Sequence, residues 1–123
     1  MRIKKARQIL KSFADDNRIR IISLLNKESL NVKELCNIIG ANQSNTSKHL
    51  ARLRLTGVVS DRREGFNVYY RLTCSENRNR RDFLNSIVQT LSRIEITRHD
   101  LDKLKKIKET RKRQLINKKG GKK

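Results

Sequence analysis

The sequence contains no proline, no tryptophan and only five glycines among its 123 residues. Because proline and glycine are the residues that most often interrupt helices, their scarcity favours a mainly α-helical chain with few sharp breaks. Aromatic residues are also rare, three Phe and two Tyr, so little is available to line a substrate pocket. The two cysteines, Cys36 and Cys74, fit a reducing cytosol better than a disulfide scaffold.

Long apolar runs and enzyme motifs are missing as well. No stretch of about 18 uncharged apolar residues exists, so we expect no membrane-spanning helix. Charges interrupt the first twenty residues, unlike the apolar core of a secretory signal. There is no phosphate-binding glycine loop, no paired-carboxylate setting and no nucleophile signature. We therefore expect a cytoplasmic protein that is not an enzyme and needs no cofactor.

Acidic residues are few relative to basic ones. Lys and Arg number 31 against 12 Asp and Glu, giving a formal charge of +19 and a pI near 10.9. Such an imbalance favours a polyanionic partner, and double-stranded DNA is the predicted one. The length suits one domain, which we predict over residues 1–102. Residues 103–123 carry eleven basic residues and one acid, and the rest of the chain retains a net +9.

We predict that residues 103–123 form a basic helical extension ending in a flexible Lys/Gly tail. Two interpretations of this extension stay open. It could be solvated and keep the protein in solution, or it could act as an arm that adds contacts to DNA phosphates.

The spacing of apolar residues predicts a series of short helices at the start of the chain. Apolar residues recur every three or four positions over residues 3–13, which indicates a first amphipathic helix. Asp15 or Asp16 is positioned to cap the second helix. Asn31, with Glu34 three residues later, matches a capping box for the third.

A fourth helix is predicted after a short turn. Gly40 ends the third helix, and Asn42 is positioned to cap the fourth. In the fourth helix, Thr46, Leu50 and Leu53 recur on one side, while the intervening residues are polar or charged. Two helices joined by a short turn that contains glycine form a helix-turn-helix pattern.

The period changes after Gly57. Apolar positions then alternate around the connection "DRREGFN", which predicts a two-stranded hairpin with the connection at residues 61–67. From about Asn79 a helical pattern returns and continues without an obvious stop into the basic end. The predicted fold class is therefore mainly α with a small β-hairpin.

Three motifs in the middle of the chain carry a family resemblance. The segment "QSNTSKHL" is followed by "L-x-x-x-G-V-V" and then by "RREG-x-x-V-Y-Y-R-L". In this order, over residues 16–72, they resemble the ArsR/SmtB family of winged helix-turn-helix repressors. The resemblance implies a winged helix-turn-helix that reads DNA with its second helix. It also implies a homodimer that pairs through its N- and C-terminal helices.

The candidate DNA-binding residues come from the fourth helix and the hairpin. Short polar side chains at a helix start can reach base edges. The free backbone amides at the same helix start favour phosphate. Ser44, Lys48 and Arg52 follow one another at single-turn spacing on one edge. The resemblance adds Ser47 and His49 and places the wing at residues 62–68. The full predicted set is Gln43, Ser44, Asn45, Ser47, Lys48, His49, Arg52, Arg62, Arg63 and Asn67.

Some of these residues have a second interpretation. His49 could hydrogen-bond within the fold instead of contacting DNA. Arg62 and Arg63 could keep an edge strand soluble instead of binding phosphate. Both alternatives stay open at the level of the sequence.

Cys36 is the one metal-ligand candidate, because metal-sensing relatives place two thiolates in this segment. Here "ELCNI" retains only the first, and a soft metal needs three or four ligands. We therefore predict no metal site and favour a small buried structural cysteine. A thiol switch that joins Cys36 and Cys74 is a further alternative, which requires α-carbons within about 7 Å.

The predicted function is a dimeric, sequence-specific DNA-binding transcriptional regulator, a repressor by resemblance. The predicted location is the cytoplasm, in association with the nucleoid. An architectural, largely non-specific DNA-packaging protein is the alternative that the charge and the lysine tail suggest. The operator, the effector and the direction of regulation are not encoded in these patterns.

Overall fold

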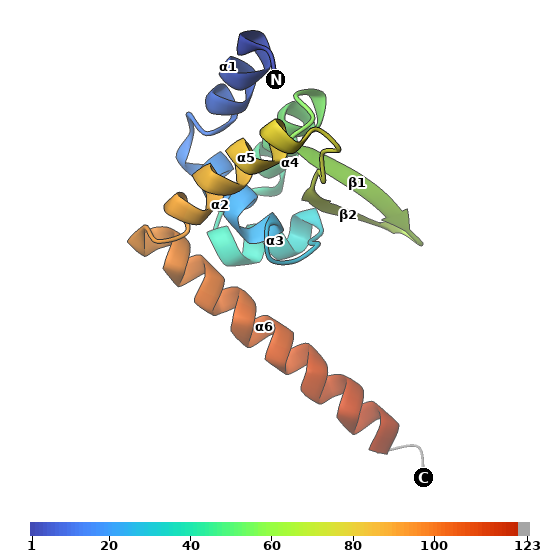
Figure 1. Cartoon of the computed structure of the whole chain (residues 1–123). Coiled ribbons are helices and arrows are strands. Elements are labelled where there is room, and N and C mark those ends of the chain that lie inside the picture. The colour runs from blue at the N-terminus through green and yellow to red at the C-terminus, as the bar shows by residue number, and fades with distance from the viewer. Residues whose placement is uncertain (121–123) are drawn as a thin grey trace.

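The chain forms six α-helices and one hairpin in the described residues. The computed structural model describes the backbone of residues 1–120 and the side chains of residues 1–117. Figure 1 shows a body of short helices with the hairpin on one side and a long helix below. The elements in chain order are α1 (Ile3–Ser12), α2 (Asp16–Leu25), α3 (Val32–Ile39), α4 (Gln43–Leu55), β1 (Val59–Glu64), β2 (Asn67–Leu72), α5 (Arg78–Leu91) and α6 (Glu95–Gly120).

The core is built around α2. This helix contacts α3, α4, α5, α6 and β2, and Ile21, Ile22, Leu24 and Leu25 are all buried. Burying four large side chains from one short helix is what lets a domain of this size hold together, because each contributes roughly 1.5–3 kcal/mol. The mainly α fold with a small hairpin is thus confirmed.

The predicted helix ends are confirmed by their caps. The side chain of Asp15 accepts the backbone N–H three residues later at the start of α2, and Asn42 does the same for α4. Asn31 and Glu34 form a reciprocal capping box on α3. Gly40 ends α3 with φ +77°, a left-handed conformation that glycine adopts without strain.

The hairpin differs from the prediction in where it turns. Its strands pair antiparallel from Val59 opposite Leu72 to Glu64 opposite Asn67, so residues 61–64 are strand and the predicted seven-residue connection is wrong. The turn contains only two residues, 65 and 66, and its first residue is a glycine with φ +63°, as a type II′ turn requires. The outer half of β1 is exposed, so it carries no apolar alternation that a sequence pattern could reveal.

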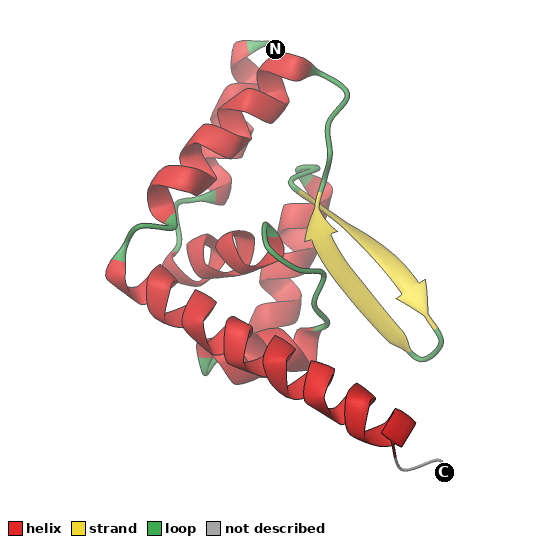
Figure 2. Ribbon diagram, turned by 60° about the horizontal axis from the view of Figure 1, so that its bottom comes forward, coloured by secondary structure: helices red, strands yellow, loops and turns green. Residues whose placement is uncertain are grey.

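The long C-terminal helical pattern is also divided. We expected one helix from about residue 79, but α5 ends at Leu91 and α6 begins at Glu95. In the turn between them, the N–H groups of Arg93 and Ile94 donate to carbonyls three residues earlier. Neither proline nor glycine marks this break. After it, α6 runs across α2 and α3 (Figure 2).

Charged contacts hold α6 along the body. Arg20 of α2 donates two hydrogen bonds, of 2.7 and 2.8 Å, to the fully buried carboxylate of Asp100. These bonds raise the pKa of Arg20 above its ordinary value, against the opposing effect of burial. Further along, Lys108 pairs with Glu28 at 2.9 Å, and Arg111 pairs with Glu34 of α3.

The predicted domain boundary at residues 102 and 103 falls inside α6. Leu104, just beyond it, is 2% exposed and belongs to the core. The last body contact of α6 among the ion pairs is made by Arg111. Of the predicted flexible Lys/Gly tail at residues 118–123, residues 118–120 continue α6, and residues 121–123 lie outside the described residues.

None of the helices in the described part of the chain is long and apolar enough to span a membrane.

The Arg20–Asp100 pair predicts a large difference between two neighbouring aspartates. Asp100→Asn should lower the free energy of unfolding by about 3 kcal/mol, because it leaves Arg20 without its buried counter-charge. Asp102→Asn, an exposed position on the same helix, should change it by less than about 0.5 kcal/mol. Urea unfolding monitored by circular dichroism measures both. Equal effects would show that the pair does not fix α6.

Candidate nucleic-acid interface

The helix-turn-helix consists of α3 and α4, and α4 is held by one narrow face. Thr46, Leu50 and Leu53 are buried, as predicted. The Thr46 hydroxyl donates to the Asn42 carbonyl at 3.0 Å, and the Cys36 thiol of α3 donates to the same hydroxyl oxygen at 3.3 Å. These contacts orient the opposite side of α4 toward solvent.

That solvent-facing side carries most of the predicted DNA-binding residues. Ser44, Lys48 and Arg52 lie one turn apart and are all exposed. The predicted residues exposed on this side of α4 are Gln43, Ser44, Asn45, Ser47, Lys48 and Arg52. Within residues 1–117, these six side chains make no hydrogen bond or ion pair, so their donors are available to a ligand.

The start of α4 adds backbone donors to this face. The Asn42 carboxamide oxygen accepts a hydrogen bond from the N–H of Asn45 at 2.8 Å and so satisfies one of the first-turn N–H groups that have no partner within the helix. The other first-turn amides and the positive end of the helix dipole face outward, a setting that favours phosphate.

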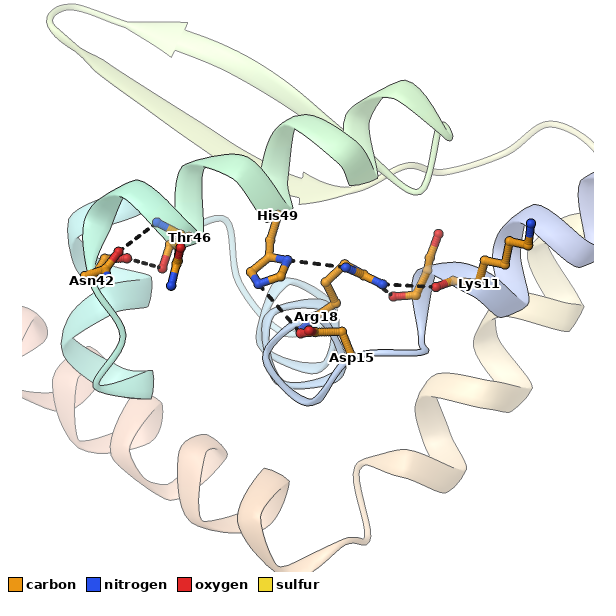
Figure 3. Close-up of polar contacts among 8 residues, drawn as sticks. Lys11, Asp15, Arg18, Asn42, Thr46 and His49 are labelled. Atoms are coloured by element: carbon orange, nitrogen blue, oxygen red, sulfur yellow. Dashed lines mark hydrogen bonds and ion pairs between the residues drawn. The ribbon is translucent and has the colours of Figure 1, made fainter.

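His49 points to the other side of α4, into a contact with α2. Its Nδ1 lies 3.4 Å from a guanidinium nitrogen of Arg18, and its Nε2 lies 3.7 Å from a carboxylate oxygen of Asp15 (Figure 3). Arg18 is 8% exposed and also donates to the carbonyls of Ser12 and Lys11 at the end of α1. The geometry favours the internal role of His49 over contact with DNA.

The same cluster favours the ionised form of Asp15. Burial by itself would raise the pKa of Asp15. The backbone N–H of Arg18 and the charges of His49 and Arg18 outweigh burial, so the pKa of Asp15 lies below its ordinary value.

The end of α4 is attached to α1. The Lys5 ammonium donates to the carbonyl of Thr56 at 2.5 Å, and the hydroxyls of Ser12 and Thr56 lie 3.3 Å apart. A cation at this place complements the negative end of the helix dipole. No local sequence pattern predicts this attachment, because Lys5 and Thr56 are 51 positions apart.

The wing projects beside α4. Arg62 pairs with Glu64 at 3.2 Å, whereas Arg63 and Asn67 have exposed side chains without a bonded partner in the described chain. Phe66 at the tip is fully exposed. Phe66 is not among the predicted DNA-binding residues, although an exposed aromatic residue in a hairpin turn is a signal for contact with a ligand surface. Nearer the base, Arg54 of α4 bonds to Asp61 of β1 at 3.0 Å.

The two cysteines lie in different surroundings. Cys36 is half-buried against Thr46, and Cys74 is exposed after β2. Both are free thiols, and the thiol switch between them stays a prediction. Among the described residues, no group of three or more His, Cys, Asp and Glu side chains is arranged to hold a metal ion.

Comparison with known proteins places this arrangement in a family. The model for the bacterial regulatory proteins of the arsR family matches residues 15–61, which include α2, α3 and α4. The transcriptional activator HlyU of Vibrio cholerae is 39% identical over 72 residues, or 58% of this chain and 67% of HlyU. The chain belongs to the ArsR family. The predicted resemblance is thereby confirmed.

Other ArsR-family relatives give the same result. The arsenical resistance operon repressor of Escherichia coli is 40% identical over 67 residues, which cover 54% of this chain and 57% of the repressor. The chain thus matches between about half and two thirds of the length of these relatives.

Solved structures extend the likeness to the whole winged fold. The structure of V. cholerae HlyU superposes with a TM-score of 0.63 at 33% identity, covering 75% of this chain and 92% of HlyU. A homodimeric winged helix-turn-helix domain from Mycobacterium bovis, a possible ArsR-family regulator, matches with a TM-score of 0.60 at 29% identity. That match covers 73% of this chain and 80% of the domain. The ArsR-type winged helix-turn-helix is therefore confirmed, and a quarter of this chain lies outside the HlyU match.

The contacts of Asp15 with Arg18 and His49 predict that the natural chain and Asp15→Asn differ in stability in a pH-dependent way. Asp15→Asn keeps a capping side chain but removes the charge, so it should lower the free energy of unfolding near neutral pH by about 0.5–1 kcal/mol. Because the folded-state pKa is lowered, the advantage of Asp15 is present above its unfolded pKa of about 3.9 and is lost as the pH falls below it.

Urea unfolding at several pH values between neutral and about pH 3 measures this difference. Asp15→Ala serves as the second variant, since it should be about 1 kcal/mol less stable than Asp15→Asn at every pH through loss of the cap. If the natural chain's excess in free energy of unfolding over Asp15→Asn grows as the pH falls, the lowered folded-state pKa of Asp15 is wrong.

Proposed function

We propose that this chain, a DNA-binding transcriptional regulator of the ArsR family, acts as a homodimeric repressor that reads a palindromic operator through α4. The observation that carries the proposal is the exposed face of α4. Its side chains are polar or basic and are not bonded to the rest of the described chain, while the buried face fixes their direction. Side chains with available donors are what base edges and phosphates require.

The wing supplies a second set of contacts. Arg63 and Asn67 lie near the tip of the hairpin, next to the exposed ring of Phe66. A basic side chain there can bind phosphate, and a polar or apolar tip can enter the minor groove. Arg62 is a lesser candidate because it already pairs with Glu64.

A homodimer would present two such surfaces. In α1, Ile3 and Leu10 are large apolar side chains that are 83% and 53% exposed. At the junction of α5 and α6, Ile94 and Ile96 are nearly half exposed as well. Covering them with a second copy is favourable, and the related M. bovis domain is homodimeric. Two α4 helices would then enter successive major grooves about 34 Å apart.

The relatives do not all regulate transcription in the same direction. The E. coli relative is named as an operon repressor, whereas V. cholerae HlyU is named as an activator. Repression is the simpler mechanism, since a dimer bound across a promoter blocks polymerase without a further contact. A regulator of this kind would be found with the nucleoid. None of the matched relatives supports the architectural alternative.

Selection from random DNA at physiological salt tests the proposal. A palindromic motif with half-sites one helical turn apart is the expected result, with at least about a thousandfold preference over scrambled DNA. Equal affinity for selected and scrambled duplexes would contradict it and would favour a DNA-packaging protein. Transcription from a promoter that carries the selected site then separates a repressor from an activator.

The exposed face of α4 predicts the effect of single substitutions. Lys48→Ala or Arg52→Ala should weaken binding to the selected site by about tenfold, because each loses a charged contact to DNA. Lys27→Ala removes the same charge from an exposed position just after α2, outside the basic extension, and should change affinity by less than twofold. Fluorescence anisotropy measures affinity, and circular dichroism checks the fold. A loss of helical signal in either α4 variant would show that the residue is structural.

The C-terminal extension predicts a separate effect on salt dependence. A chain that ends after Arg111 keeps the ion pairs that α6 makes with the body within residues 1–117 but loses six Lys and Arg residues. Its specificity should be unchanged, while its affinity falls and its salt dependence becomes shallower, because fewer phosphates are neutralised. Unchanged affinity would show that the extension is only solvated. Deletion from residue 103 would not test this, since it also removes Leu104 from the core.

A further inference from the structure

A strongly basic pocket lies between the starts of α1 and α5. Figures 1 and 2 both show these two helix starts side by side. The pocket has a volume of about 580 Å³ and is open to solvent. Its charged and amide lining consists of Arg2, Lys4, Lys5, Gln8, Asn77 and Arg80.

The positive charges of this pocket are not neutralised within the protein. No acidic side chain lines it, and none of its four cations forms an ion pair within residues 1–117. The Nε atom of Arg80 is buried without a hydrogen-bond partner. Burial lowers the pKa of Lys5, and the charge of Arg80 lowers it further. Elsewhere, Arg20, Lys108 and Arg111 have acidic partners.

The pocket is separate from the surfaces already assigned. Lys4, Lys5 and Gln8 lie on the side of α1 that faces α5, whereas Ile3 and Leu10 lie on the side proposed for dimerisation. The exposed face of α4 belongs to a different element, and none of its residues lines the pocket. The pocket reaches α4 only through Lys5, which bonds to Thr56 at the helix end.

We infer that this pocket binds a small anion that carries two or more phosphate groups. Four cations around one open space suit several negative charges, because a single carboxylate could pair with only one or two of them. The start of α5 adds its positive dipole end, and the amides of Gln8 and Asn77 supply further donors. The volume suits a compact phosphorylated molecule.

Binding at this pocket has a consequence for α4. The Lys5 ammonium donates to the Thr56 carbonyl and also lines the pocket, so a phosphate that attracts this ammonium toward the pocket weakens the attachment of α1 to the end of α4. If the ligand-bound form holds α4 less firmly, ligand and DNA oppose each other's binding to the same extent. This coupling rests on the proposed DNA-binding function, whereas the pocket itself does not.

Calorimetric titration of the full chain with sodium tripolyphosphate, without DNA, tests the pocket. One site per chain is expected, and Arg80→Gln should weaken it by about tenfold. Lys4→Gln is a second variant at an exposed position, where loss of folding is not a concern. Lys106→Gln is the matched control for the loss of one positive charge. If all three variants bind tripolyphosphate equally, the attraction is general and the pocket assignment is wrong.

Anisotropy with the selected duplex, at constant ionic strength, tests the coupling. Tripolyphosphate should lower DNA affinity several-fold in the natural chain and have less effect in Lys5→Met. An unchanged affinity in the natural chain would overturn the coupling but not the site. If Arg80→Gln and Lys4→Gln weaken DNA binding but leave tripolyphosphate binding intact, the pocket binds DNA phosphates and the proposal is overturned. Absence of specific DNA binding would instead contradict the proposed function.

Discussion

The orientation of α4 depends on the burial of Thr46, Leu50 and Leu53. Because these three side chains face the core, the opposite face of α4, which we propose as the DNA interface, faces solvent. Only these three of thirteen side chains on α4 are buried, so apolar packing alone provides a narrow attachment. Burial of the two leucines contributes roughly 1.5–3 kcal/mol each. Polar contacts extend this attachment along the helix: Cys36 near its start, Arg18 at its middle and Lys5 at its end. The outer face is thereby left free of internal partners.

Two helices outside the helix-turn-helix support this arrangement from opposite ends. The helix α1 reaches the end of α4 through Lys5, and α6 reaches α3 through Arg111 and Glu34. In a chain of charge +19, three of the twelve acids, Asp100, Glu28 and Glu34, form the ion pairs that hold α6 to the body. Lys48 and Arg52 on the exposed face of α4 have no acidic partner within residues 1–117. That face is therefore suited to a polyanion.

Local signals were sufficient to predict the central part of the fold. The caps at Asn31 and Asn42, the break at Gly40 and the buried leucines of α4 all depend on residues within one or two helical turns. The break between α5 and α6 carries no such local signal, and α6 docks after it through Asp100 against Arg20, a contact across 80 positions. The inward direction of His49 and the Lys5–Thr56 bond are likewise long-range contacts. The strand extension to Glu64 was missed because both of its faces are exposed.

We propose that the chain meets DNA with the outer face of α4 and the wing. Amide chemical shifts, followed while a selected operator duplex is titrated into the isotope-labelled full chain, locate this contact residue by residue. The largest changes should fall in residues 43–52 and 62–67, with small changes across the buried side of α2. Changes confined to the basic end of α6, with α4 unaffected, would contradict this assignment.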